Sequence, residues 1–329
     1  MLILAKSTMA LMLGFILAII VGLLFIPLMK KLNVGQQVSH SLKKHLKKEG
    51  TPTMGGFIFI IPTILAILFL WMYGSVEISS NIIIVLFVFL SYAALGFADD
   101  YLKVKYKNNK GLSRLLKLLI QTMIALVFFY IFIRNGGEPT IEITFLNLDL
   151  NLGWIYGLFI LFLLVGSSNA VNLTDGLDGL AGGLSAIAFL AYGLIAWSTS
   201  WLAGYTEIAV FCFVLVGSLL GFLLFNTHKA KVFMGDTGSM ALGATLAAIA
   251  ILTRHEISLA VIGGVFVIET VTTLIQIIAI RKFKKRVFKK APLHHHFEEL
   301  GWEETDIVKL FWVVGLILAM LMITYGVWL

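Results

Sequence analysis

Long apolar stretches separated by short polar connections make up most of this chain. A helix of about 20 apolar residues is long enough to cross the roughly 30 Å hydrocarbon core of a bilayer. The pattern predicts ten spans, at residues 8–29, 55–74, 80–98, 115–134, 153–171, 179–198, 207–225, 239–253, 258–280 and 306–328. We therefore expect an all-α integral membrane protein with a single polytopic domain over residues 1–329.

Composition supports this interpretation. Of the 329 residues, 59% are hydrophobic and 13% are charged, whereas soluble domains carry roughly 25% charged residues. A soluble globule would be unable to bury so much apolar surface. The first apolar stretch is longer than a signal peptide and lacks a clear small-residue cleavage site, so we expect a retained span. The single cysteine, Cys212, excludes an internal disulfide and a cysteine-based metal site.

Lysine and arginine gather in alternate connections, at residues 30–54, 99–117 and 281–305. The opposite connections carry mainly Arg134 and Arg254. The positive-inside rule then predicts basic loops in the cytoplasm and both termini outside, with five cytoplasmic loops forming an active site. The basic residues also suit contact with anionic lipid headgroups of the bilayer. Nucleic-acid binding is not expected, because no soluble domain presents an element that reads a groove.

Two connections have their own patterns. Residues 138–151 alternate apolar and polar side chains, which predicts a short β-hairpin on the outer side. Residues 281–305 begin as a basic helix extension, break at Pro292 and continue as HHHFEELGWEET. We expect this second part to be an amphipathic helix at the membrane interface.

Aspartates are placed unevenly along the chain. Five of the seven lie at or just beyond the predicted cytoplasmic ends of spans, namely Asp99, Asp100, Asp175, Asp178 and Asp236. Ionisable residues in such places are costly and usually functional. The adjacent carboxylates of Asp99 and Asp100 repel each other, and a bound cation relieves that repulsion. For this pair alone, a solvated helix end is the simpler interpretation.

Two further polar segments contain the other three aspartates. Segment 167–183, SSNAVNLTDGLDGLAGG, combines amides and carboxylates with glycines that permit tight turns beside a ligand. The GDTGS sequence around Asp236 precedes an apolar helix whose free N–H groups and positive dipole end suit phosphate. A simple N-cap by Asp236 or Thr237 is the alternative. It leaves Asn226, His228 and Lys231 unexplained.

The three consecutive histidines at 294–296 resemble a zinc site only superficially. Adjacent side chains on a helix point in different directions, whereas helical metal ligands use spacings such as i and i+4. We expect phosphate or sugar hydrogen bonding by at least one of them. Carboxylates and amides without a Cys/His cage suit Mg²⁺, which is held by one or two carboxylates, waters and substrate phosphates. The residues thus predict a cytoplasm-facing, metal-assisted phosphate site.

Six segments together carry a family resemblance: GTPTMGG at 50–56, DDYLK at 99–103, KGLSRLLK at 110–117, NLTDGLDGLAGG at 172–183, VFMGDTGS at 232–239 and PLHHHFE at 292–298. They resemble the bacterial phospho-N-acetylmuramoyl-pentapeptide transferases, a branch of the polyprenyl-phosphate N-acetylhexosamine-1-phosphate transferase superfamily. The DD and NxxDGxDG patterns are shared across the superfamily. GTPTMGG and PLHHHFE are specific to the muramoyl branch, and no motif position departs from its pattern.

The resemblance implies a Mg²⁺-dependent reaction in the bacterial cell membrane, between UDP-N-acetylmuramoyl-pentapeptide and undecaprenyl phosphate, that yields lipid I and UMP. A homodimer is compatible with it. It also implies that Asp99, Asp100 and Asp236 are essential, with Asp236 as the metal ligand and Asp99 as base or nucleophile. The implied substrate-binding residues are Lys48, Thr53, Lys103, Lys117, Asn172, Asp175, Asp178, Asn226, Phe233, Ser239, Gln276, His294, His295 and His296.

Alternatives remain open at this point. We expect a single displacement in which Asp99 deprotonates the lipid phosphate, with Phe233 stacked on the uracil. The rival is a covalent phospho-sugar intermediate on an aspartate. A sister transferase of N-acetylglucosamine-1-phosphate is the nearest other function. A transporter is a third, but its ionisable residues belong near the bilayer midplane, where only Glu269 lies here.

Overall fold

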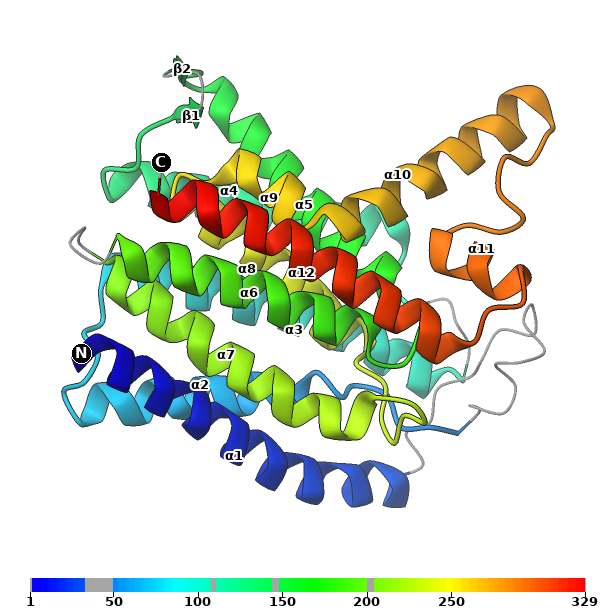
Figure 1. Ribbon diagram of the computed structural model, residues 1–329, viewed down its shortest axis with the longest axis horizontal. Coiled ribbons are helices and arrows are strands. Elements are labelled where there is room, and N and C mark those ends of the chain that lie inside the picture. The colour runs from blue at the N-terminus through cyan, green and yellow to red at the C-terminus, as the bar shows by residue number, and fades with distance from the viewer. Residues whose placement is uncertain (1, 33–49, 108–110, 144–147, 200–203, 329) are drawn as a thin grey trace.

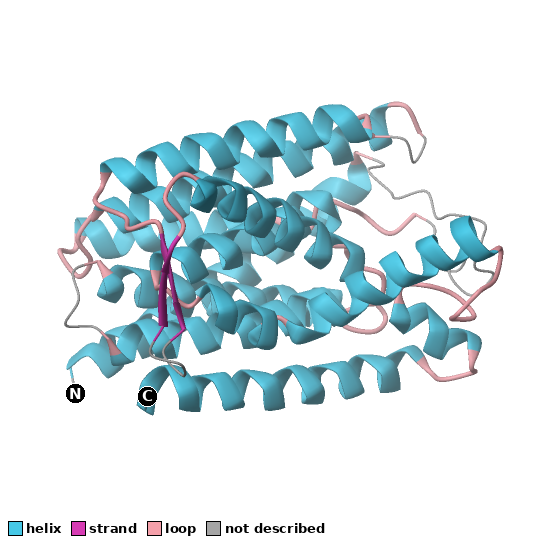
Figure 2. Ribbon diagram, turned by 90° about the horizontal axis from the view of Figure 1, so that it is seen from above, coloured by secondary structure: helices cyan, strands magenta, loops and turns pink. Residues whose placement is uncertain are grey.

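The chain folds into a bundle of long helices in a computed structural model that describes residues 2–32, 50–107, 111–143, 148–199 and 204–328. Figure 1 shows both termini and the β-hairpin at one end of the bundle, with the α10 and α11 region extending from the other. Seen from above in Figure 2, the hairpin again lies toward the end that holds the termini. The expected common location of the two termini is confirmed.

The helices in the described residues are α1 (Leu2–Lys31), α2 (Phe57–Met72), α3 (Ser80–Lys105), α4 (Arg114–Arg134), α5 (Ile155–Thr174), α6 (Leu180–Ser198), α7 (Tyr205–Asn226), α8 (Gly235–Leu252), α9 (Glu256–Ile262), α10 (Gly264–Ile278), α11 (Leu293–Glu299) and α12 (Glu304–Trp328). A π-helical turn, Ala279–Phe283, extends α10. The strands β1 (Thr140–Ile143) and β2 (Leu148–Asn151) form the predicted antiparallel hairpin, with Thr140 opposite Asn151.

Within the described residues, nine helices are long and apolar enough to cross a membrane. This confirms the all-α multi-pass fold, but three predicted spans differ in detail. The span expected at 55–74 is the shorter α2, with 16 residues. The span expected at 258–280 is divided at Gly263 into α9 and α10. Helix α8 begins at Gly235, so Asp236 lies in its first turn and not ahead of it.

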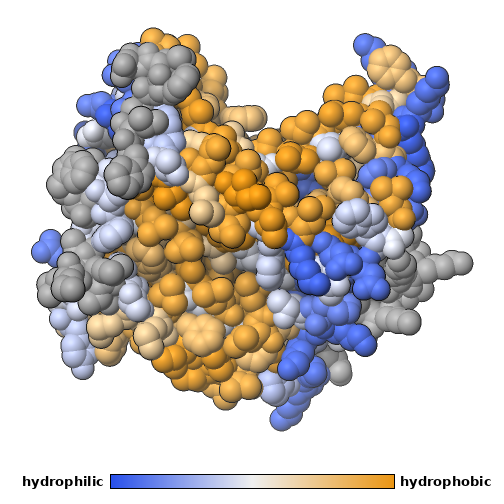
Figure 3. Space-filling view, in the orientation of Figure 1, coloured by the Kyte–Doolittle hydropathy of each residue, from blue (hydrophilic) through white to orange (hydrophobic). Residues whose placement is uncertain are grey.

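The bundle has a buried centre and an apolar outer surface. Of the apolar stretches of α7 and α8, 89% is buried inside the protein. Helix α1 packs along α7, α3 and α5 pack on α8, and α6 lies against α7 and α12. Leucine, isoleucine and other large apolar side chains of α1, α4 and α12 face outward, and Figure 3 shows a broad apolar band on the face it displays. Such a band suits contact with lipid chains.

One close contact between two helices positions the candidate site. Gly96 of α3 lies against the first turn of α8, where an added Cβ would be 2.1 Å from the carbonyl oxygen of Asp236. Only glycine permits this approach, because any side chain would overlap the opposing backbone. The next turn of α3 carries Asp99 and Asp100. Close packing at Gly96 therefore brings these two aspartates up to Asp236.

Candidate active site

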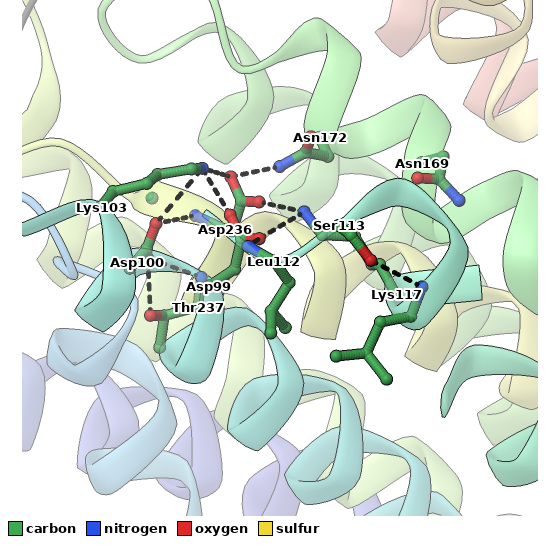
Figure 4. Close-up of polar contacts among 12 residues, drawn as sticks. Asp99, Asp100, Lys103, Leu112, Ser113, Lys117, Asn169, Asn172, Asp236 and Thr237 are labelled. Atoms are coloured by element: carbon green, nitrogen blue, oxygen red, sulfur yellow. Dashed lines mark hydrogen bonds and ion pairs between the residues drawn. The ribbon is translucent and has the colours of Figure 1, made fainter. Parts of the chain in front are cut away.

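Four charged side chains from three helices meet at the junction of α3, α4 and α8, as Figure 4 shows. Lys103 Nζ lies 2.7 Å from Asp99 Oδ2 and 3.1 Å from Asp236 Oδ1. Lys117 Nζ lies 3.1 Å from Asp99 Oδ1 and 2.8 Å from Asp236 Oδ2. Each ammonium group thus bridges the same two carboxylates. We term these four residues the aspartate–lysine cluster.

The end of α5 joins this cluster through an amide. Asn172 Nδ2 donates to Asp236 Oδ1 at 3.0 Å and to Ser239 Oγ at 2.8 Å. The Ser239 hydroxyl in turn donates to the carbonyl oxygen of Gly235 at 3.0 Å. Direct contacts therefore link seven of the predicted site residues, from four helices: Asp99, Asp100, Lys103, Lys117, Asn172, Asp236 and Ser239.

The two carboxylates of the cluster differ in access. The Asp99 side chain is 2% exposed and accepts a hydrogen bond from the Leu112 N–H at 2.8 Å, in the turn before α4. Ser113 then begins α4 as an N-cap by accepting from the Leu116 N–H at 3.2 Å. The Asp236 side chain is 13% exposed. A ligand from the polar end of the bundle therefore meets Asp236 before it meets Asp99.

The carboxylate of Asp100 has different partners from the carboxylate of Asp99. Its carboxylate accepts hydrogen bonds from the backbone N–H groups of Asp236 and Thr237, at 3.1 and 2.9 Å, and from the Thr237 hydroxyl at 2.7 Å. These N–H groups are the ones that the sequence suggested for phosphate. The suggestion was wrong for this pair, because a carboxylate from α3 already caps the helix. Asp100 therefore holds Asp236 in place.

The GTPTMGG segment runs alongside the residues that precede α8. The Phe233 N–H donates to the Pro52 carbonyl, and the Gly55 N–H donates to the Phe233 carbonyl, both at 2.8 Å. Thr53 lies between these contacts and is buried, whereas the Phe233 side chain is partly exposed. This backbone pairing fixes where Phe233 lies. Lys48, also predicted to bind substrate, lies outside the described residues.

A second polar group surrounds Asp178. Its N–H donates to Glu304 Oε1 at 2.7 Å, and its Oδ2 accepts from the Ala230 N–H at 3.0 Å. His228 Nδ1 lies 3.7 Å from Asp178 Oδ2 and 3.8 Å from Glu304 Oε2. Asp178 thus joins the DGLDG turn to the loop before α8 and to the start of α12.

Two amides predicted to bind substrate are hydrogen-bonded within the protein instead. Asn226 Nδ2 donates to the Val232 carbonyl at 3.0 Å, and its Oδ1 accepts from the Gly179 N–H at 3.1 Å. Gln276 Oε1 accepts from both N–H groups of residues 287–288, and its Nε2 donates to a carbonyl there at 2.9 Å. Both amides hold neighbouring backbone segments in place, and their predicted contacts with substrate stay predictions.

Asp175 ends α5 and faces several carboxylates. Burial, together with the negative charges of Asp236, Asp100 and Asp178, raises the pKa of Asp175 from 3.8 to about 8. At neutral pH its carboxyl is therefore largely protonated and able to donate a hydrogen bond. A neutral acid beside charged carboxylates suits a site that receives an anion.

The three histidines, which we term the histidine segment (His294–His296), point to different partners. His294 is fully buried. His295 Nδ1 lies 2.6 Å from Glu298 Oε2, and burial lowers the pKa of His295. His296 Nδ1 accepts from the Lys289 N–H at 3.1 Å. The prediction that the three rings do not share one ion agrees with this arrangement, and the substrate-binding role of His295 stays a prediction.

The carboxylates at the cluster fit a divalent cation. Asp99, Asp100 and Asp236 each offer an oxygen, and these oxygens lie within 4.8 Å of one another. An all-oxygen donor set suits Mg²⁺ better than zinc or copper. Positive charge already balances these oxygens here, supplied by the two lysines. The predicted role of Asp236 as metal ligand is consistent with its greater access.

Sequence reasoning missed several residues around the site. Leu112 contributes a backbone N–H, which no side-chain pattern reveals. Glu304 lies far from the DGLDG turn along the chain, yet it binds that turn. Glu269 was noted only as a lone charge inside a span, and its partners lie in the histidine segment. A lone charge inside an apolar helix is the signal that could have prompted a search for them.

Known proteins resemble this chain along its whole length. Residues 82–254 match the family described as glycosyl transferase family 4. A phospho-N-acetylmuramoyl-pentapeptide-transferase of Geobacillus sp. (strain WCH70) is 49% identical over 322 residues, 98% of each chain. The proteins of the same name in Bacillus licheniformis and Bacillus subtilis (strain 168) are 48% and 47% identical, covering 96% and 97% of each chain.

Proposed function

Because this chain belongs to the family of phospho-N-acetylmuramoyl-pentapeptide-transferases, we propose that it transfers phospho-N-acetylmuramoyl-pentapeptide from its UDP-linked form to undecaprenyl phosphate. The products are lipid I and UMP. The observation that carries the proposal is the aspartate–lysine cluster, in which two carboxylates and two ammonium groups from three helices meet. Nine helices of spanning length in the described residues place this site in a multi-pass membrane protein.

Mg²⁺ is the proposed cofactor, with Asp236 as its ligand. A cation bound there supplies charge neutralisation for the departing UMP. Asp100 acts on this ligand through the α8 backbone, since it caps the two N–H groups at and after Asp236. Asn172 orients the same carboxylate from the other side.

Lys103 and Lys117 supply the positive charge that meets the diphosphate. Phosphoryl transfer depends mainly on positioning and charge neutralisation, and each lysine is already held by two carboxylates. Asp99 lies deeper, with both oxygens bound by these lysines. We propose that Asp99 positions the lysines and takes any proton from the lipid phosphate, whose attack on the sugar-linked phosphorus releases UMP. An adduct of sugar-phosphate on an aspartate, trapped with donor alone, would contradict this single displacement.

We assign recognition of the UDP-linked substrate to the segments that border the aspartate–lysine cluster. Phe233, partly exposed and fixed by backbone pairing with GTPTMGG, is proposed to stack on the uracil. The protonated Asp175 carboxyl donates a hydrogen bond to an oxygen of the UDP-linked substrate. His295 contacts the sugar or a phosphate of the same substrate. Asp178, Asn226 and Gln276 shape this region through the loops that they hold.

The site is proposed to face the cytoplasm. Lys103 and Lys117 lie beside the aspartates, and seven lysines and arginines lie in residues 281–290. Hydrophilic residues gather at the end opposite the termini in Figure 3. The positive-inside rule then orients this end toward the compartment where nucleotide sugars are made.

A UMP-release assay tests the proposal directly. Purified protein in lipid nanodiscs receives UDP-N-acetylmuramoyl-pentapeptide and undecaprenyl phosphate, with Mg²⁺ or with chelator, and both UMP and lipid product are measured. We expect equal amounts of the two products, only when the cation and both substrates are present. UDP-N-acetylglucosamine in place of the muramoyl donor separates the sister reaction, and turnover of that donor alone would refute the assignment.

A further inference from the structure

Glu269 is the one acidic residue of α10, and its carboxylate is fully buried. The helix around it is otherwise built from apolar residues, threonines and a glutamine. Burying a carboxylate without partners is costly, so such a group persists only where it is hydrogen-bonded or paired. Its partners therefore identify what the residue does.

Those partners belong to the start of α11 and the histidine segment. Glu269 Oε2 accepts a hydrogen bond from the Leu293 N–H at 2.7 Å, and Oε1 accepts from the His294 N–H at 3.1 Å. The ring of His294 is 1% exposed, and its Nδ1 lies 3.2 Å from Glu269 Oε2. One carboxylate thus binds the backbone at Leu293 and His294, and its Oε2 also lies beside the His294 ring.

The other side of the His294 ring meets the DGLDG turn. An added Cβ at Gly176 would lie 2.4 Å from His294 Nε2, so the ring fits only against a glycine. Gly176 directly follows Asp175. The imidazole is therefore fixed between Glu269 of α10 and the turn that borders the aspartate–lysine cluster.

The far end of α11 is attached elsewhere. Phe297 packs on Phe311 of α12 and on Trp302, with ring centroids 6.0 and 5.0 Å apart. The first turn of α11 thus depends on Glu269, while the last turn depends on aromatic packing. His295 and His296 lie between these two attachments, so their directions follow from both.

We propose that Glu269 is a positioning residue for the histidine segment: by holding the His294 ring against Gly176, it sets where His295 meets the donor. The inference rests on the proposed function for its kinetic part only. The contact between Glu269 and His294 is independent of the reaction. Loss of the carboxylate would release the ring and the first turn of α11 without touching the aspartate–lysine cluster.

The test combines nitrogen NMR with kinetics on the full chain in nanodiscs. Histidines are labelled with ¹⁵N, and the His294 signals are assigned by their loss in His294→Asn. We expect Glu269→Gln, which keeps the size of the side chain, to shift the His294 ring signals away from their wild-type positions. Gly176→Ala should shift them as well, because the added methyl displaces the ring from its other side.

Kinetic measurements then distinguish a positioning role of Glu269 from a general loss of protein stability. We expect both variants to lose roughly 10- to 100-fold in kcat/KM for the UDP-linked donor, mainly through KM, because reacting groups tolerate little displacement. Glu269→Asp, which retains the charge, should recover part of the loss. The matched control is Glu299→Gln, the same substitution at an exposed position in α11, and it should leave both readouts unchanged.

Three results would overturn the inference. They are unchanged His294 signals in Glu269→Gln, unchanged donor KM in that variant, and a loss confined to kcat. If the wild-type protein transfers nothing while the His294 signals still depend on Glu269, the proposed reaction fails and the contact itself stands. If transfer proceeds and the signals are indifferent to Glu269, only the positioning role fails.

Discussion

The aspartate–lysine cluster and the histidine segment border the same site but are supported in different ways. The cluster is supplied by α3, α4 and α8, and α8 is among the most buried helices. The histidine segment depends on α10, which extends away from the bundle in Figure 1 before the chain returns as α11. The cluster is thus fixed by packing from several sides. The histidine segment is fixed by a few single contacts, so a single substitution can shift its position.

The largest effect is expected at the cluster. Asp236→Asn removes the negative charge that pairs with Lys103 and Lys117 and that we assign to the cation. Transfer should fall roughly 100- to 1,000-fold or more, as when a central electrostatic group is lost. UMP release measures it, with Asp149→Asn on the exposed hairpin as the matched control. Near-normal turnover by Asp236→Asn would contradict the proposed role of Asp236 as metal ligand.

A smaller effect is expected where α10 holds the basic connection. Gln276→Ala removes the hydrogen bonds to residues 287–288 and should free the lysines and arginines of 281–290. We expect faster trypsin cleavage in this connection. We also expect a roughly tenfold loss in kcat/KM, because hydrogen bonds that support the residues around a site set the geometry of that site. Thr272→Ala is the control, because its hydroxyl bonds only within α10. Unaltered cleavage would show that the amide does not hold this connection.

Asp175 should give a pH-dependent effect. Its pKa of about 8 means that the carboxyl ionises between pH 7 and 9, adding negative charge where the diphosphate binds. The donor KM should rise roughly fivefold over that range, and Asp175→Asn, which mimics the neutral acid, should abolish the rise. Because folding raises this pKa from 3.8, the folded state holds the proton more tightly, and its contribution to the free energy of unfolding falls as pH increases from about 4 to 8. An identical alkaline rise in the variant would exclude Asp175 as its source.

The smallest effect is expected at the opposite end of the bundle. Arg254, between α8 and α9, forms ion pairs with Glu138 and Glu142 beside the hairpin. Exposed pairs of this kind contribute about 0 to 1 kcal/mol. Arg254→Gln should therefore change UMP release by less than about twofold, within the range expected for such a pair. A large loss of UMP release would show that contacts at the hairpin end of the bundle affect the aspartate–lysine cluster at the other end.

Much of this arrangement was predictable from local patterns. Apolar length predicted the helices, and alternation over 138–151 predicted the hairpin. The placement of aspartates at span ends predicted that Asp99 and Asp236 lie at the same end of the bundle, although 137 positions separate them. These features depend on bilayer thickness, charge and side-chain periodicity, which a single sequence carries.

The roles of individual polar groups were less predictable, because each depends on a partner far along the chain. Asp100 was expected to be essential, but its hydrogen bonds to the first turn of α8, 136 residues away, were not foreseen. Asn226 and Gln276 were expected to face substrate, and both hold backbone loops. A helix end accepts any well-placed carboxylate or amide, so packing alone decides which side chain occupies it.

The carboxylate of Glu269 also bears on how the chain enters the bilayer. An acidic residue inside an inserting helix is unfavourable at the translocon, by up to about 3.5 kcal/mol at the helix centre. The backbone groups that bind Glu269 lie 24 and 25 residues later, so they leave the ribosome after α10. Helix α10 is therefore synthesised before the two backbone partners of its carboxylate. The hydrogen bonds that compensate the burial of Glu269 can form only after residues 293 and 294 have been synthesised.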